Sequence, residues 1–194
     1  MDVIQFFVLH HARLSAQIED HFGHLTDDQV RVRPHPLMNS IAWLLWQSAC
    51  CEDMLNILLI SHPLLLDEGG WFLRLNLPRR DVGTAMSTEQ VSEFSNRVDV
   101  GVLRAYHAAV GLRTEQIVRD LLPQDLDVVP DSSQVHQLFH EGGVFGPQAR
   151  AGEQFYSGKT KGWFLGHLGL THPREHFAQA VLVRKMQGLG SGRR

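Results

Sequence analysis

The chain has 194 residues, of which 43% are hydrophobic and 20% are charged, and its formal net charge is −3 with neutral histidines. This composition is ordinary for a globular protein, and the length suffices for one domain with a substantial core, which we expect to span residues 1–194. The basic residues do not gather into one run, which argues against a nucleic-acid-binding protein. No apolar run approaches the length of a membrane span, so we expect no membrane partner.

The start of the chain and its two cysteines indicate the cellular compartment. Asp2 stands where a signal peptide would have basic residues, and His10 and His11 interrupt the first apolar stretch, so no signal peptide is predicted. Cys50 and Cys51 are adjacent and are therefore poor partners for a structural disulfide, which favours a reducing compartment. We expect a cytoplasmic protein.

A proline-containing connection follows the first predicted helix. Apolar residues recur mostly every three or four positions over residues 1–23, which predicts an amphipathic helix that ends at Gly23. Pro34 and Pro36 mark residues 25–37 as a connection.

The second predicted helix covers residues 40–60, with Asn39 as its N-cap. It is apolar around most of its surface, which implies deep burial. His62 and Pro63 end it. The irregular residues 61–86 that follow are long enough for a crossover, so the second and third helices can run parallel.

The third predicted helix covers residues 88–122 and begins at a capping box formed by Ser87 and Gln90. Residues 124–161 are rich in Gly, Ser, Pro and Gln. They hold one short predicted helix, over residues 133–140.

The fourth predicted helix covers residues 160–188 and contains Pro173. Because proline lacks a backbone N–H, it should kink the helix next to His172. Four long helices with little strand signal predict an all-α fold, a four-helix bundle with long crossover connections.

Two histidines of the fourth helix form the strongest candidate site. His172 and His176 lie about one turn apart on one helix face, and such a pair binds a metal ion when a neighbouring helix adds a third ligand. In a chain with 12 histidines, spacing alone is explained more simply by two polar histidines on a partly buried face. His136 and His140 share the spacing, and chance explains them better; His107 is an alternative third ligand.

Two stretches resemble the DinB/YfiT-like family of four-helix bundles. The run NSIAWLLWQ at residues 39–47, followed by Glu52 and Asp53, resembles the second helix of that family. The run HPREH at residues 172–176, which continues to Gly188, resembles the end of its fourth helix. The resemblance covers most of the chain in order and implies the fold of that family.

The resemblance also implies a metal centre. Members of the family typically carry a divalent metal, often nickel or zinc, on one histidine of the second helix and an H-x-x-x-H pair of the fourth. His172 and His176 match the pair, whereas the second-helix position is Gln47 here. An amide oxygen binds zinc or nickel more weakly than an imidazole does. Three alternatives follow: Gln47 or a water completes the metal site, another histidine does so, or the pocket is metal-free.

Four further residues are expected near the pair. Trp43 and Trp46 should form core and pocket wall, because aromatic residues at helical spacing usually pack. His167 precedes His172 by five residues and points about 140° away from it on an ideal helix, so we expect it behind the ligands or at the surface. Glu52 should either orient a histidine or pair with an arginine of the fourth helix.

Three functional hypotheses follow. The resemblance implies a metal-dependent enzyme, a thiol-dependent transferase or a hydrolase, that uses a low-molecular-weight thiol and acts on a small-molecule substrate in a pocket between the second and fourth helices. The second hypothesis is a metal-free protein in which Gln47, His172 and His176 line a polar pocket for small-molecule binding or acid–base chemistry. The third is a stress-related dimer without catalysis; family members commonly dimerise through bundle faces, so we expect a homodimer.

Overall fold

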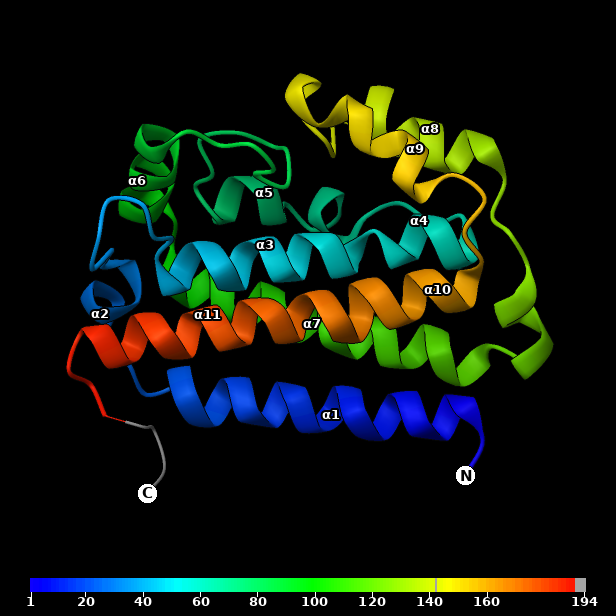
Figure 1. Cartoon of the computed structure of the whole chain (residues 1–194), viewed down its shortest axis with the longest axis horizontal. Helices are drawn as coiled ribbons and strands as arrows, with labels where there is room; N and C mark the ends of the chain where they lie inside the picture. Colours follow the sequence, from blue (N-terminus) through cyan, green and yellow to red (C-terminus); the bar gives the residue numbers. More distant parts are fainter. Residues whose placement is uncertain (142, 191–194) are drawn as a thin grey trace.

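The structure is a computed structural model of the chain and describes residues 1–141 and 143–190. All regular secondary structure in these residues is helical, as predicted, and the long helices lie side by side along the long axis of the molecule (Figure 1). No helix in the described part of the chain combines the length and apolar character that a membrane span needs. The long helices are α1 (Val3–Phe22), α3 (Ile41–Asp53) with its continuation α4 (Leu55–Ile60), α7 (Val100–Asp120), and the run from α10 (Lys161–Gly166) through η4 (His167–Thr171) to α11 (His172–Met186).

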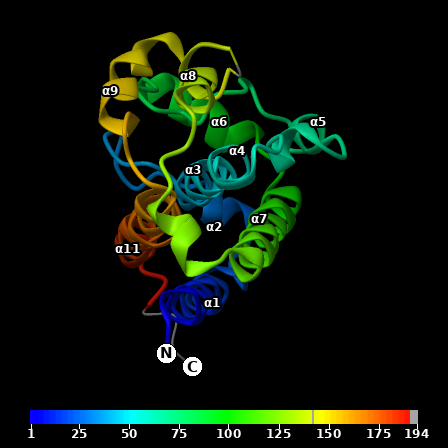
Figure 2. The same cartoon turned by 90° about the vertical axis from the view of Figure 1, so that its right-hand side faces the viewer.

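Helix α3 lies at the centre of the molecule. Every residue from Ile41 to Asp53 is buried, as its largely apolar surface predicts. The helix packs against α7 and α11. The end-on view shows α1 opposite α3, between α7 and α11, while short helices cover the other side of α3 (Figure 2). Any polar group of α3 must therefore find its partner within the protein.

Side-chain caps start the first two long helices. Asp2 and Gln5 form a capping box at the start of α1. Ser40 caps α3, since its hydroxyl accepts a hydrogen bond from the Trp43 N–H at 3.0 Å. The predicted cap, Asn39, is wrong by one residue.

Helices α3 and α7 run parallel, as the long linker between them allows (Figure 1). Tyr106 contacts Asp53, and Arg113, two turns further along α7, contacts Asn56 just beyond α3. Helices α1 and α11 run in the opposite direction (Figure 1).

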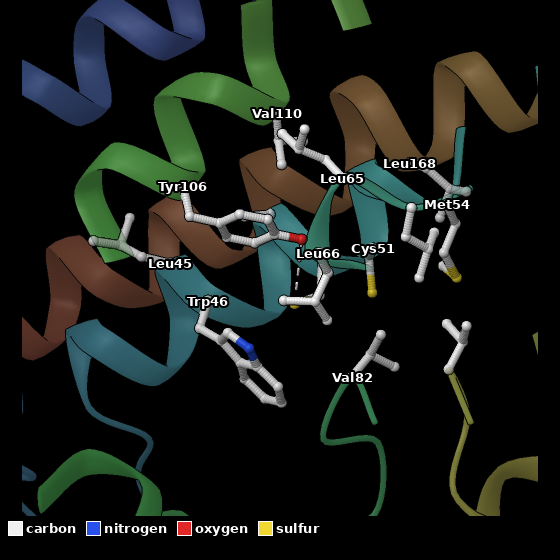
Figure 3. Close-up of a cluster of buried hydrophobic side chains, with 14 of the residues drawn as sticks. Leu45, Trp46, Cys51, Met54, Leu65, Leu66, Val82, Tyr106, Val110 and Leu168 are labelled. Atoms are coloured by element: carbon white, nitrogen blue, oxygen red, sulfur yellow. Dashed lines mark hydrogen bonds between the residues drawn. The ribbon is translucent and has the colours of Figure 1, made fainter. Parts of the chain in front are cut away.

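Asp53 fastens the crossover to the bundle. Its carboxylate accepts hydrogen bonds from the backbone N–H groups of Leu65 and Leu66 at 2.8 and 2.9 Å, from the Tyr106 hydroxyl at 2.8 Å and from the Asn56 amide at 2.7 Å. Figure 3 shows Tyr106 reaching from α7 toward Leu66 among the buried side chains. Burial raises the pKa of Asp53 to about 6, against the hydrogen bonds that lower it.

The predicted third helix, residues 88–122, is two helices. Residue Asp99 accepts a hydrogen bond from the Val102 N–H and so starts α7 as a separate helix after α6 (Thr88–Arg97). The predicted capping box at Ser87 is confirmed. An internal cap therefore overrides the continuous apolar pattern.

Short helices occupy the segments predicted as connections. In residues 25–37, Thr26 and Gln29 form a capping box that starts α2, which the prediction missed. The short helix predicted over residues 133–140 is confirmed. The short elements are α2 (Asp27–Arg31), η1 (Leu65–Asp67), α5 (Trp71–Arg74), η2 (Pro123–Asp127), α8 (Ser132–His140), η3 (Pro147–Gly152) and α9 (Glu153–Tyr156).

The irregularity expected at Pro173 is a π-helical turn. Proline cannot donate to the carbonyl four residues earlier, and the residues just before His172 form the wider turn η4. Within this turn, Gly169 lies against Phe7 of α1 and Leu55 of α4. A Cβ atom on Gly169 would stand 2.8 Å from the Phe7 ring.

This contact yields a test with a matched control. Gly169→Ala should destabilise the protein by about 1–3 kcal/mol, because the added methyl group forces Phe7 and Leu55 apart. Gly166→Ala, in the same helical run and with open space around its Cβ position, should be neutral or stabilise by up to about 1 kcal/mol. Urea unfolding measures both changes, and equal effects would contradict the packing described.

Candidate functional site

His172 and His176 converge at the start of α11. Their Nε2 atoms lie 3.1 Å apart, and their ring centroids are separated by 4.4 Å at an interplanar angle of 84°. Both side chains are half-buried. The Nε2 atoms of the two rings are therefore close enough to bind the same ion.

The π-helical turn also brings His167 toward this pair. Its ring centroid lies 6.2 Å from that of His172, and the ring stacks on Trp163 at 4.7 Å. In a π-helix, residues five positions apart are bonded neighbours along the axis, so the angle of about 140° expected from an ideal α-helix does not apply. His167 stands behind His172, supported by an aromatic ring.

The second helix of the bundle contributes Trp43 and Gln47. The Trp43 ring meets His176 edge to face, with 6.1 Å between centroids, and its indole N–H points to the Met86 sulfur at 3.2 Å. Gln47 is one turn further along the same face of α3. Because α3 and α11 run in opposite directions, this step leads from His176 toward His172 (Figure 1).

Three buried polar atoms in this region lack a hydrogen-bond partner among the described residues. They are the Oε1 atom of Gln47 and the Nδ1 atoms of His172 and His176. Gln47 is only 8% exposed, so water does not readily solvate its amide oxygen. Orphaned polar atoms of this kind mark a place where the protein alone does not complete the bonding.

Burial keeps both histidines neutral. It lowers the pKa of His172 to about 3, together with smaller contributions from the nearby His176 and His167. Burial also lowers the pKa of His176, although Gln179 and Glu175 oppose this shift. Neutral imidazoles carry the free nitrogen lone pairs that a metal ion requires.

These residues fit a divalent metal ion. Two nitrogens that each bind a tetrahedral zinc ion at about 2.0–2.1 Å lie roughly 3.3 Å apart, and the His172 and His176 Nε2 atoms, 3.1 Å apart, are close to that spacing. The unpaired Gln47 oxygen offers a third, weaker donor.

Trp46 lies away from the pair. Its ring packs on Phe94 at 4.5 Å, and Gly83 lies against its outer edge. Trp46 is thus a core residue that positions α6, whereas Trp43 alone of the two tryptophans contacts a candidate ligand.

Glu52 orients a histidine, but that histidine is His11 of α1. Its carboxylate lies 2.8 Å from His11 Nε2, and Glu115 of α7 lies 3.5 Å from His11 Nδ1. Burial lowers the pKa of His11, but the hydrogen bonds and charges of Glu52 and Glu115 more than offset this, so the pKa is raised. This charged cluster connects α1, α3 and α7.

A cavity of about 360 Å³ borders this cluster between α1 and α7. His107 lines it, together with Glu19, Arg104 and Glu115, and burial lowers the pKa of His107. The cavity does not include Gln47, His172 or His176. His107 consequently lies with the α1–α7 cavity, not with the candidate metal ligands.

The sequence interpretation underestimated one further cluster. His136 and His140 of α8 meet Glu153 of α9, so their spacing is more than the coincidence we expected. The spacing of the two histidines was visible in the sequence. The carboxylate, 13 residues after His140, had no signal of its own.

The His11 cluster generates a prediction about stability. His11→Leu leaves the buried Glu52 carboxylate unpaired and should cost about 3–5 kcal/mol near pH 6. Because the pKa of His11 is raised in the folded state, its contribution is complete below its ordinary pKa of about 6.5 and is lost as pH rises through the higher folded value. The penalty should therefore shrink at alkaline pH.

Urea unfolding between pH 6 and pH 9 measures this change, with His10→Leu as the control at the neighbouring half-buried position. A pH-independent penalty at His11, or the same profile at His10, would contradict the charged pair.

Comparisons with known proteins agree with this architecture. The model of the DinB superfamily matches residues 9–180. A crystal structure of a conserved protein from Enterococcus faecalis is similar over 96% of this chain and 97% of that one, with a TM-score of 0.73 and 20% sequence identity. At that identity the likeness concerns the fold alone. No curated protein matches the chain. Because the family model covers most of the sequence, the chain belongs to the DinB superfamily.

Proposed function

We propose that the protein is a metal-dependent enzyme whose divalent ion, zinc or nickel, is held by His172 and His176. The observation that carries the proposal is the 3.1 Å separation of the two Nε2 atoms on neutral, half-buried imidazoles. Gln47 Oε1 or a bound water completes the set of ligands. Membership of the DinB superfamily supports a metal-associated role.

When bound, such an ion supplies a Lewis acid that polarises a substrate group or lowers the pKa of a bound thiol or water. The chain itself holds the two imidazoles neutral and aimed at one point. Trp43 covers His176, and the ring of His167 stands beside His172, which limits water around the pair. The substrate class that fits this role is a small molecule with an electrophilic centre.

We further propose that the reaction is thiol-dependent group transfer or hydrolysis, with a low-molecular-weight thiol as the nucleophile in the transfer. The two cysteines of the chain are not candidates for this nucleophile. Both are buried, and burial raises the pKa of Cys51 to about 12 and that of Cys50 as well. A nucleophilic thiol must therefore come from outside the chain.

One observation favours a metal-free alternative. Metal-binding histidines usually donate their second N–H to a carboxylate or carbonyl, yet the Nδ1 atom of His172 has no such partner among the described residues. In the metal-free state, one neutral histidine donates its Nε2–H to the other, and Gln47 adds an acceptor for a polar ligand. This site would bind a small molecule or exchange protons with it.

The metal affinity of the unchanged chain, compared with that of Gln47→His, separates the two functions: a metal-free pocket binds zinc or nickel only after the third histidine is added. In a metal site, Gln47→His replaces a weak donor by a strong one and should raise zinc and nickel affinity at least about tenfold. The control, Gln124→His, adds a histidine at an exposed position of η2. Competition with a chromophoric chelator measures the affinity. The protein is untagged and also carries Glu153→Gln, which removes one potential ligand from the cluster of His136, His140 and Glu153.

Removing both ligands through His172→Ala and His176→Ala should abolish binding at this site. The metal-dependent function would be contradicted by wild-type affinity in that double variant. It would also be contradicted by a gain at Gln47 no larger than at Gln124.

A further inference from the structure

His136, His140 and Glu153 form a second cluster of potential metal ligands. Glu153 shares its two carboxylate oxygens between the histidines: Oε1 lies 3.1 Å from His136 Nδ1, and Oε2 lies 2.7 Å from His140 Nε2. The candidate ligand atoms all lie within 4.8 Å of one another. Figure 1 shows α8 and α9 adjacent, on the side of α4 away from α1.

A packed aromatic base holds the three ligands. Phe139 of α8 stacks on Phe145 at 4.3 Å and meets Tyr156 of α9 at 5.5 Å. Gly152, which directly precedes Glu153, lies so close to Phe139 that a Cβ atom there would stand 3.2 Å from the ring. Glu153 thus emerges from a backbone that is fixed against α8, which favours a preformed site.

The electrostatics of the cluster favour a cation. The Glu153 carboxylate brings one negative charge to both imidazole rings. The imidazole rings stack with centroids 4.3 Å apart, and two protonated rings at that distance repel each other. One divalent cation satisfies both imidazoles and the carboxylate at once, without protonating either ring.

The dimensions are also suitable. Ligand atoms around a tetrahedral zinc ion lie roughly 3.3–3.6 Å apart. Side-chain movements of about 1 Å therefore bring the ligand atoms of His136, His140 and Glu153 to that spacing. His136 and His140 are exposed and Glu153 is half-buried, which gives an ion access from solvent. Two histidines and one carboxylate leave a coordination position open.

We propose that His136, His140 and Glu153 form a second metal site, specific for divalent ions of the zinc class, that joins α8 to α9. This site shares no ligand with the ion proposed at His172 and His176. A chain with both sites binds two equivalents of metal, and each site can be removed separately.

Zinc titration of an untagged His172→Ala, His176→Ala background tests the proposal, by competition with a chromophoric chelator. We expect one equivalent of zinc to remain bound. Loss of an outer partner of a metal ligand already weakens binding 10–100-fold, so His136→Ala, His140→Ala or Glu153→Gln should each weaken it at least about tenfold. The control is His35→Ala, at an exposed position outside the cluster, which should change nothing.

A second readout is thermal stability. Zinc should raise the unfolding midpoint of the background variant and should not raise that of its Glu153→Gln derivative. If circular dichroism shows that an alanine variant does not fold, the zinc affinity of Glu153→Gln tests the proposal alone, because this change keeps the shape of the side chain and removes only its charge. The proposal is overturned if the background binds no zinc, or if binding survives Glu153→Gln and both histidine changes.

Failure here and failure of the site on α11 give different results. If His172→Ala with His176→Ala abolishes all zinc binding, the site proposed on α11 stands and the site proposed between α8 and α9 is wrong. If the chain binds one equivalent that only Glu153→Gln abolishes, the site between α8 and α9 stands and the site on α11 is wrong.

Discussion

The burial of α3 on every side is the constraint on which the rest of the structure depends. A helix without a solvent face must have each of its polar side chains bonded by another part of the chain. Asp53 meets this demand with the N–H groups of Leu65 and Leu66 and with the Tyr106 hydroxyl, and so ties the crossover to the bundle. Glu52 meets it with His11, which ties α1 to α3.

Gln47, like Trp46 and Ser48 beside it on α3, has a buried polar atom without a hydrogen-bond partner among the described residues. Its amide oxygen has no partner among the described residues, and it lies one turn along α3 from Trp43, whose ring meets His176. Structural needs account for Asp53 and Glu52, and they leave Gln47 unexplained. In the function proposed above, a bound ion or small ligand is the partner of Gln47.

Local pattern was enough to predict the long helices and the His172–His176 pair, because helical periodicity and i, i+4 spacing are properties of a short stretch. It could not predict that Glu52 pairs with His11 or that Glu153 joins His136, since those partners come from distant segments. The angle of about 140° expected between His167 and His172 does not apply, because a π-helical turn changes the angle between residues. The single domain, the homodimer and the cytoplasmic location stay predictions.

Anomalous diffraction from crystals grown with zinc tests the central claim most directly, because it locates the ion without reference to activity. The account expects an anomalous peak at about 2.0–2.2 Å from the Nε2 atoms of both His172 and His176, with the Gln47 amide or a water completing the site. The absence of a peak there, with the two Nε2 atoms still hydrogen-bonded to each other, would contradict it.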